Sequence, residues 1–351
     1  MIPKSGNRFS DKVMLQEAVP VLAVEGLHVT FRTPDTTVRA VDGVSWSVGP
    51  GEILGIVGES GCGKSVSALA VMGLVPDAPG RVQGSVRLHG RELVGMPESE
   101  LRSIRGSAVS MIFQEPMSSL DPVMRIGRQI AEPLVVHRGL SWRAARGHAV
   151  ELLRKTHIPE PERRIDEYPH QLSGGMRQRV MIAMALACRP AVLIADEPTT
   201  ALDVTIQAQI LELLLDLRRE LATAIVFITH DLGVIAEIAD RVVVMYAGRK
   251  IEEAPVASLF ARPQHPYTAG LLAAVPRLSR TGAPARVRLA EIEGTVPTLD
   301  RETVGCSFAP RCRIATERCR RDDPPLMLRH QRHVAACWHS ERAAQAVAEF
   351  G

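Results

Sequence analysis

Hydrophobic and polar residues alternate along the first ordered-looking part of the chain. In residues 22–31 and 38–48 apolar side chains tend to fall at every second position, which is the period of a strand with one buried face. Residues 52–57 (EILGIV) form a continuous apolar run instead, and such runs are typical of a strand buried on both faces. Similar apolar runs predict further strands at 191–196, 224–230 and 241–248.

Helical patterns separate these apolar runs. Residues 66–75 predict one helix, residues 122–188 read mainly as helices, and residues 204–222 predict a long amphipathic helix. Residues 85–113 are expected to return to strands. Strands that alternate with helices predict an α/β fold with a mostly parallel core sheet.

The composition changes along the chain and suggests three parts. Residues 1–20 are polar and are expected to be flexible. Residues 21–258 carry the α/β pattern, with a helical lobe at about 115–185. Residues 259–351 are rich in Pro and Arg and are expected to form a small C-terminal domain.

Charge and hydropathy restrict where the protein acts. The formal net charge of +3 is too small to indicate a nucleic-acid partner, and none is expected. We find no apolar core of a secretion signal near the start and no apolar run of about 18 residues that would span a membrane. The protein is therefore expected in the cytosol, where disulfides are rare.

A phosphate-binding loop follows the first buried strand. The sequence GESGCGKS fits the pattern G-x-x-x-x-G-K-[ST] between a strand and a helix, and it comprises Gly58, Glu59, Ser60, Gly61, Cys62, Gly63, Lys64 and Ser65. In such a loop backbone N–H groups surround the phosphates, the lysine reaches the β and γ oxygens, and the hydroxyl holds Mg²⁺. Lys64 and Ser65 are the corresponding residues here. We interpret Cys62 as a small residue that fills the loop.

An acidic pair ends another predicted buried strand. Asp196 is placed to bind Mg²⁺, and Glu197 is placed to act as the base that activates the attacking water. Together with the phosphate loop, this pair indicates a nucleoside triphosphatase.

Further motifs indicate which class of nucleoside triphosphatase the chain resembles. The stretch LSGGMRQR at 172–179 stands with Gln114 after one strand, ALD at 201–203 and His230 after another. In their order and spacing over residues 22–255, these motifs resemble the ATP-binding subunits of ABC transporters. The resemblance implies a P-loop ATPase fold with a RecA-like core sheet, an antiparallel β subdomain and a helical signature subdomain. It also implies that the substrate is ATP with Mg²⁺.

The resemblance gives roles to individual residues. It implies that His230 contacts the γ-phosphate and the attacking water, and that Gln114 senses Mg²⁺ and couples to membrane subunits. Phe31 is similar to the aromatic residue that stacks on adenine, with ordinary strand packing as the alternative. The resemblance implies that the signature that caps the γ-phosphate across a dimer interface consists of Ser173, Gly174 and Gly175. It also implies that Asp203 links the two ATP sites.

One copy of each motif implies a dimer of ATPase subunits with ATP between them. The partners implied are a second homologous ABC ATPase subunit, two transmembrane permease subunits and an extracytoplasmic solute-binding protein. The chain is then expected as a peripheral protein at the cytoplasmic face of the membrane.

Two segments resemble one subgroup of these transporters. The run FQEPMSSLDPVMRIGRQI at 113–130 and the run RPQHPYTAGLLAAVP at 262–276 are similar to the importers of oligopeptides, dipeptides and nickel. The leading hypothesis is an ATP-hydrolysing translocase subunit for peptide import. The alternatives are a nickel or other small-solute importer and, from another class, an ABC ATPase without a transport role.

Four of the six cysteines lie in the last 50 residues, at Cys306, Cys312, Cys319 and Cys337. Their spacing lacks the short C-x₂₋₄-C pairs usual in zinc sites and differs from ferredoxin patterns. Chemistry alone therefore leaves an iron–sulfur cluster, zinc and free thiols open. The resemblance to the peptide importers implies a structural [4Fe–4S] cluster, with zinc as the alternative.

We further expect the many arginines around these cysteines to favour thiolates; they are Arg311, Arg313, Arg318, Arg320 and Arg321. Because the phosphate loop is assigned to another domain, nucleotide binding is expected to be independent of the cysteines.

Overall fold

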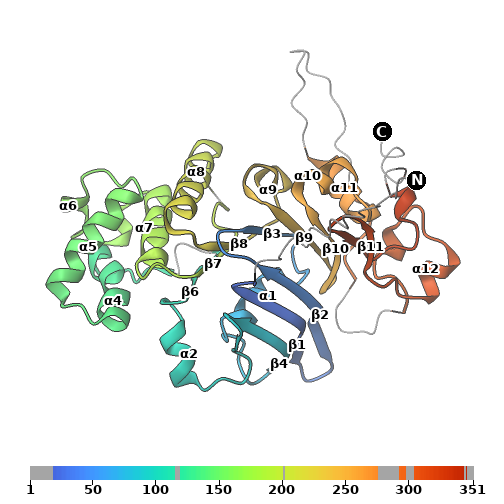
Figure 1. Cartoon of the computed structure of the whole chain (residues 1–351), viewed down its shortest axis with the longest axis horizontal. Coiled ribbons are helices and arrows are strands. Elements are labelled where there is room, and N and C mark those ends of the chain that lie inside the picture. The colour runs from blue at the N-terminus through green and yellow to red at the C-terminus, as the bar shows by residue number, and fades with distance from the viewer. Residues whose placement is uncertain are drawn as a thin grey trace, which may run out of the picture.

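The computed structural model describes residues 19–114, 119–200, 202–275, 292–297, 304–343 and 345. Figure 1 shows a core sheet with helices above it, an antiparallel sheet below, a helical lobe on the left and the C-terminal region on the right. This arrangement confirms the predicted α/β class.

The antiparallel sheet has the strand order β2-β1-β4-β5. Its strands are β1 (Leu22–Arg32), β2 (Thr37–Val48), β4 (Gly80–Leu88) and β5 (Arg91–Glu92). The alternating residues of β1 and β2 bury one face in a hydrophobic core that also receives the first helix. Helix α2 (Glu98–Ile104) was not foreseen, and the expectation of strands throughout 85–113 is wrong there.

The second sheet contains the predicted parallel core. Its order is β11-β12-β10-β9-β3-β8-β7-β6, and the pairs from β9 to β6 are parallel. The five core strands are β3 (Ile53–Val57), β6 (Val109–Ile112), β7 (Val192–Asp196), β8 (Ala224–Thr229) and β9 (Arg241–Tyr246). Nearly all their residues are buried, as continuous apolar runs predict.

Antiparallel strands extend one edge of this sheet. They are β10 (Arg249–Pro255), β12 (His333–Ala335) and β11 (Met327–His330). In the ladder between β10 and β12, Glu252 is opposite Ala335 and Glu253 is opposite Val334. The core sheet therefore continues across the boundary expected near residue 258.

Helices cover the core sheet and form the lobe. Around the sheet lie α1 (Lys64–Val71), α8 (Val204–Leu221), α9 (Leu232–Ile238), α10 (Val256–Ala261) and α11 (Pro266–Ala274). The lobe contains α4 (Ile126–Arg138), α5 (Trp142–Lys155), α6 (Pro161–Arg164) and α7 (Gly174–Leu186), and α4, α5 and α7 pack against one another. This lobe confirms the helices predicted over 122–188. The C-terminal region adds α12 (Glu317–Arg321) and the 3₁₀ turn Ala309–Arg311.

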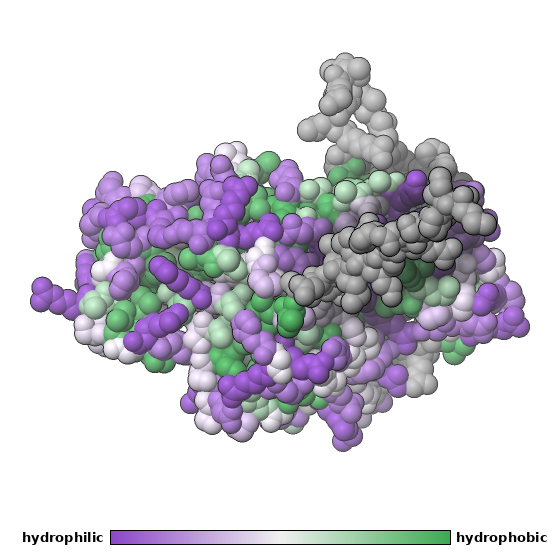
Figure 2. Space-filling model, viewed as in Figure 1, coloured by the Kyte–Doolittle hydropathy of each residue, from purple (hydrophilic) through white to green (hydrophobic). Residues whose placement is uncertain are grey.

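The surface carries both hydrophobic and hydrophilic residues. On the face shown in Figure 2, hydrophobic residues occur in small areas between hydrophilic ones. Within the described part of the chain, every helix is too short or too polar to pass through a membrane.

A buried carboxylate fastens the C-terminal strands to the core. Glu252 on β10 and His333 on β12 are 0% and 1% exposed, and His333 Nε2 lies 2.6 Å from Glu252 Oε1. The Glu252 carboxylate also accepts hydrogen bonds from the backbone N–H groups of Gln264 (2.6 Å) and His265 (3.0 Å). Glu252 thus joins β10, β12 and the start of α11 through one side chain.

His333→Ala is expected to destabilise the protein by about 1–3 kcal/mol, because Glu252 loses one of these three buried hydrogen-bond partners. The loss should appear in urea denaturation and as faster hydrogen exchange over residues 327–336. His330→Ala is the matched control, since His330 is exposed on the neighbouring strand, and it should change stability by less than about 0.5 kcal/mol. Equal stability of the two variants would contradict the anchoring role of Glu252.

Candidate functional site

The candidate chemical groups gather at one edge of the parallel sheet. Gly58 follows β3, Gln114 follows β6, Glu197 follows β7 and His230 follows β8. These strands are neighbours in the sheet and run in the same direction. Their carboxyl ends meet at one edge, the usual position of ligand sites in open α/β sheets.

The phosphate loop is curled around its own lysine. Lys64 Nζ donates to the carbonyl oxygens of Gly58 (2.8 Å) and Glu59 (3.0 Å). Gly63 precedes α1 with φ of 97°, and a Cβ there would lie 2.3 Å from the carbonyl oxygen of Ala40, so only glycine fits. The loop therefore presents backbone N–H groups and the N-terminus of α1 to one place, which is the arrangement that binds phosphate.

Cys62 lies inside this loop and is fully buried. Burial raises the pKa of its thiol, although the nearby Lys64 opposes the shift. A thiol kept in its protonated form is a poor nucleophile.

Ser65 and Asp196 bring two oxygen ligands together. Ser65 Oγ donates to Asp196 Oδ1 at 3.0 Å, and Asp196 is only 3% exposed. Burial raises the pKa of Asp196 above its usual value, and the charge of Glu197 adds to the rise, while Ser65 and Lys64 oppose it. A hydroxyl beside a carboxylate is the hard oxygen set that Mg²⁺ prefers. These two residues would therefore suit a Mg²⁺ ion.

Three side chains orient the carboxylate of Glu197. Gln114 Nε2 donates to Oε2 at 3.3 Å, Thr200 Oγ1 donates to Oε2 at 2.9 Å, and His230 Nδ1 lies 3.3 Å from Oε1. Glu197 itself has φ of 46°, a left-handed conformation that is strained for a residue with a side chain. A carboxylate held in this way beside the largely exposed His230 is suited to accept a proton from water.

Sequence reasoning missed Thr200 as a partner of Glu197. The signal was a hydroxyl residue three positions after the base, which places its side chain back toward the carboxylate across the turn that follows β7.

The signature residues lie away from the phosphate loop of the same chain. Ser173 caps α7 by accepting from the N–H of Met176 at 3.4 Å, and Ser173 and Gly174 are exposed. Gly175 lets α7 approach α8, because a Cβ there would lie 2.8 Å from Ile206 Cγ2. Figure 1 places α7 in the helical lobe, apart from α1.

Asp203 and Phe31 also stand outside the cluster around Glu197. Asp203 caps α8 by accepting from the N–H of Ile206 at 2.9 Å. Phe31 on β1 is paired with Val38 and lies beside Gly80 of β4, in the packing of the antiparallel sheet. Residues 115–118 of the run after Gln114, and position 201 of the ALD motif, lie outside the described residues.

The four C-terminal cysteines meet around one small cavity. Its lining includes Cys306, Cys312, Cys319 and Cys337. Thr316 Oγ1 lies 3.5 Å from Cys319 Sγ, and the N–H of His339 donates to Cys337 Sγ at 3.4 Å. Among the described residues, no three His, Cys, Asp or Glu side chains form a group that could hold a metal ion. The four cysteines thus line one cavity without forming such a group in the described residues.

The surrounding arginines do not activate the thiols of Cys306, Cys312 and Cys337. Burial, reinforced by the neighbouring cysteines, raises the pKa of Cys306 to about 11 and that of Cys337 to about 12. Burial also raises the pKa of Cys312. The expectation that arginines favour thiolates is wrong for these three cysteines, because Arg311 and Arg313 bind Glu59 and Glu293.

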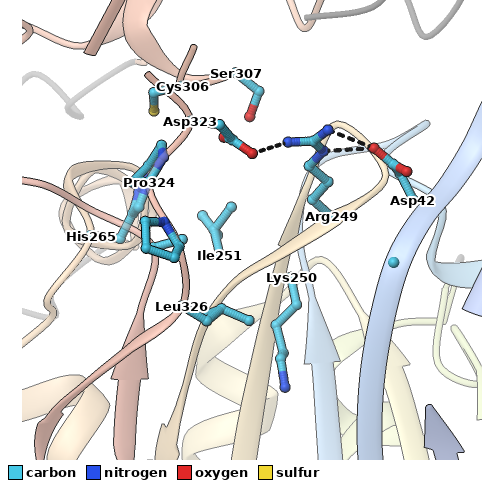
Figure 3. Close-up of a pocket in the computed structure, with 13 residues that line it drawn as sticks. Asp42, Arg249, Lys250, Ile251, His265, Cys306, Ser307, Asp323, Pro324 and Leu326 are labelled. Atoms are coloured by element: carbon cyan, nitrogen blue, oxygen red, sulfur yellow. Dashed lines mark hydrogen bonds and ion pairs between the residues drawn. The ribbon is translucent and has the colours of Figure 1, made fainter. Parts of the chain in front are cut away.

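Charged pairs join the C-terminal region to the rest of the chain. Figure 3 shows a pocket in which Arg249 of β10 lies between Asp42 of β2 and Asp323, and Arg249 Nε donates to Asp42 Oδ2 at 2.8 Å. His265, Cys306 and Pro324 line both this pocket and the cysteine cavity. The pocket therefore lies at the junction of the C-terminal region with the two sheets.

The C-terminal region also contacts the phosphate loop directly. Arg311 Nη1 and Nη2 donate to the two carboxylate oxygens of Glu59 at 2.7 and 3.0 Å, and Tyr267 Oη accepts from the N–H of Glu59 at 2.8 Å. The premise that the cysteine region and the phosphate loop are separate is therefore wrong. Sequence reasoning missed Arg311 and Tyr267 because no local pattern marks a contact across 252 residues.

Two protein families match this chain. The ABC transporter family matches residues 41–200, and the C-terminal region of oligopeptide/dipeptide transporters matches residues 251–319.

Curated relatives and solved structures agree with these matches. A probable peptide ABC transporter ATP-binding protein of Sinorhizobium fredii is 53% identical over 91% of this chain and 95% of its own length. The oligopeptide transport ATP-binding protein OppD of Salmonella typhimurium is 51% identical over 92% and 95%. The dipeptide transport ATP-binding protein DppD of Bacillus subtilis is 49% identical over 93% and 96%. Among solved structures, the dimeric ATP-binding cassette MJ0796 bound to ADP and Pi is 29% identical with a TM-score of 0.60, over 67% of this chain and 98% of that one.

Asp196→Asn is expected to raise the thermal midpoint of the nucleotide-free protein by about 1–3 °C, because it removes a buried charge without changing the shape of the side chain. The pKa of Asp196 is raised in the folded state, so its protonated form stabilises the fold. The difference between wild type and variant should be largest above the folded-state pKa. It should vanish as the pH falls toward the ordinary value of 3.8.

Thermal denaturation across pH tests this expectation. Asp216→Asn, an exposed aspartate on α8, is the control and should show no such pH-dependent gain. Mg²⁺ with ATP should stabilise the wild type more than Asp196→Asn. An Asp196→Asn variant that is less stable than wild type at neutral pH would contradict the buried-charge argument.

Proposed function

The chain belongs to the ABC transporter family, and from this premise we propose that it is the ATP-hydrolysing subunit that powers import of di- and oligopeptides. The observation that carries the proposal is identity of about half over nine-tenths of the chain to oligopeptide and dipeptide transport ATP-binding proteins. The match includes the C-terminal region named for those transporters. The names of these relatives favour peptides over nickel as the solute.

The geometry supports distinct roles for individual residues of the ATP site. Lys64 and the amides of the loop 58–65 bind the β- and γ-phosphates, and Ser65 and Asp196 hold Mg²⁺. When bound, Mg²⁺ neutralises charge that develops on the phosphate oxygens. Glu197 accepts a proton from the attacking water, and His230 and Gln114 hold its carboxylate in place. We also propose that Phe31 stacks on the adenine ring of ATP.

The site requires a second subunit. The exposed N-terminus of α7, with Ser173 to Gly175, offers N–H groups and a helix dipole to a phosphate. Because α7 lies apart from the phosphate loop of its own chain, we propose that it caps ATP bound to a partner. We propose that this partner is a second homologous ATPase subunit, and that Asp203 at the start of α8 links the two sites.

Exposed apolar residues at or near the helical lobe support docking to membrane subunits. Phe113, Val123 and Trp142 are large hydrophobic residues with exposed side chains at or near the helical lobe, and Val123 is 82% exposed. Exposed apolar side chains of this kind are suited to bind another protein. We propose that the lobe docks on two transmembrane permease subunits at the cytoplasmic face of the membrane. A solute-binding protein on the other side would supply the peptide.

We propose that residues 21–258 form the ATPase domain and that residues 259–351 hold a [4Fe–4S] cluster. Support comes from the cavity lined by Cys306, Cys312, Cys319 and Cys337, since four thiolates are the usual cluster ligands. A zinc ion draws its sulfurs to about 2.3 Å from one point, whereas a cluster is larger and takes its sulfurs farther apart. Zinc is the alternative, and the iron and zinc contents of the purified protein distinguish the two. The raised thiol pKa values imply that binding releases protons and weakens in acid.

Glu197→Gln should keep ATP binding and reduce ATP turnover by about 10² or more, because the amide cannot accept the proton of water. The variant should also accumulate the closed ATP-bound dimer in size-exclusion chromatography. Glu212→Gln, an exposed residue on α8, is the control and should turn over at the wild-type rate. Wild-type turnover in Glu197→Gln would remove this residue from the role of base.

Protein purified without oxygen should be brown, absorb broadly near about 400 nm and contain about four irons per chain. Replacing any one of the four cavity cysteines by serine should reduce iron and colour and should expose residues 304–343 to protease. Cys188→Ser is the matched control, since Cys188 is buried in the ATPase domain beside Pro133 and outside the cavity. Colourless anaerobic protein with one zinc per chain would replace the cluster by a zinc site.

A further inference from the structure

Arg311 reaches from the cysteine region into the ATP site. Its side chain is only 4% exposed. All five of its N–H donors have acceptors: two bind the Glu59 carboxylate, and the others bind the carbonyl oxygens of Ile292 and Glu293 and the hydroxyl of Tyr246. A guanidinium held on every side is fixed in position, so the carboxylate that it binds is fixed as well.

Glu59 is held at three points, and one of them is the phosphate-binding lysine. Arg311 binds its side chain, Tyr267 Oη accepts from its N–H, and its carbonyl oxygen accepts from Lys64 Nζ at 3.0 Å. Two of these three partners belong to the chain beyond residue 258. The C-terminal region therefore sets the position of the peptide group that holds Lys64.

The negative charge of Glu59 explains why its ion pair with Arg311 is needed. A carboxylate on a loop that binds a triphosphate repels the ligand, unless a cation neutralises the carboxylate. Arg311 supplies that cation in bidentate geometry, which lysine cannot reproduce. The hydrogen bonds to Glu59 are the largest cause that raises the pKa of Arg311, so the guanidinium stays charged.

We infer that Arg311 is a positioning residue for ATP binding: it neutralises Glu59 and holds the phosphate loop in its binding conformation from outside the ATPase motifs. The inference rests on the proposed function in ATP binding, and it does not depend on what the cysteine cavity holds. Arg311 has no contact with Glu197 or His230 among its hydrogen bonds in the described residues, so it should affect the affinity for ATP and not the chemical step.

Equilibrium binding of a fluorescent ATP analogue to the full chain, with Mg²⁺, tests this inference. Arg311→Gln should raise the Kd about tenfold, because it leaves an unpaired carboxylate in the loop. Arg311→Lys should raise the Kd about threefold, since charge remains but the bidentate contact is lost. In steady-state assays Arg311→Gln should raise KM and leave kcat within about twofold.

The double variant Glu59→Gln with Arg311→Gln separates positioning from general folding. Removing the unpaired carboxylate should return the Kd to within about threefold of wild type, a rescue that a merely structural arginine would not show. Arg313→Gln is the matched control, because Arg313 binds the exposed Glu293 rather than the loop, and its Kd should stay within about twofold.

Two results would overturn the inference. One is an Arg311→Gln protein whose Kd lies within twofold of wild type. The other is a double variant that binds as weakly as Arg311→Gln alone. If Arg311→Gln does not fold, Arg311→Lys decides instead. A Kd raised about threefold that Glu59→Gln returns to the wild-type value supports the inference. An unchanged Kd, or a raised Kd that Glu59→Gln does not lower, overturns it.

Discussion

The parallel register of four neighbouring strands is the constraint on which the ATP site depends. Near their carboxyl ends the paired positions are Val57 with Thr229, Asp196 with Ile228, and Ile112 with Ala195. The strands therefore end almost level, and the residues that follow them emerge at one edge. A slip of one residue would turn every side chain of a strand to the opposite face, and would exchange the places of Asp196 and Glu197.

This constraint allows the site to contain groups that are unfavourable by themselves. Asp196 is buried with a raised pKa beside a second carboxylate, and Glu197 has a left-handed backbone conformation. Such features cost free energy, and they persist only where the surrounding structure is stable enough to hold them in place. The buried parallel strands provide that support, so the stability of the core maintains a site that lowers stability locally.

Patterns within short stretches of sequence predicted the strands and the motifs that depend on neighbouring residues alone. Continuous apolar runs marked the buried strands, and motif spacing marked the phosphate loop and the acidic pair. Helix α2 was missed because it is short and follows a strand hairpin, where the alternating pattern is still the dominant signal. The contacts of Arg311 with Glu59 and of Glu252 with His333 could not be predicted, since they join residues 252 and 81 positions apart. Such pairs depend on how complete elements pack and leave no periodic trace in the sequence.

The C-terminal region is small, and Arg311 and His333 are among the residues that join it to the rest of the chain. Strands β11 and β12 have four and three residues, so the region offers few ladder hydrogen bonds and only a small core. Segments of this size usually need a covalent or metal-centred link to hold one conformation. Arg311 stands directly before Cys312 and depends on that conformation to meet Glu59. If Arg311 positions the phosphate loop as we infer, the order of the segment that carries the cysteines contributes to the order of that loop.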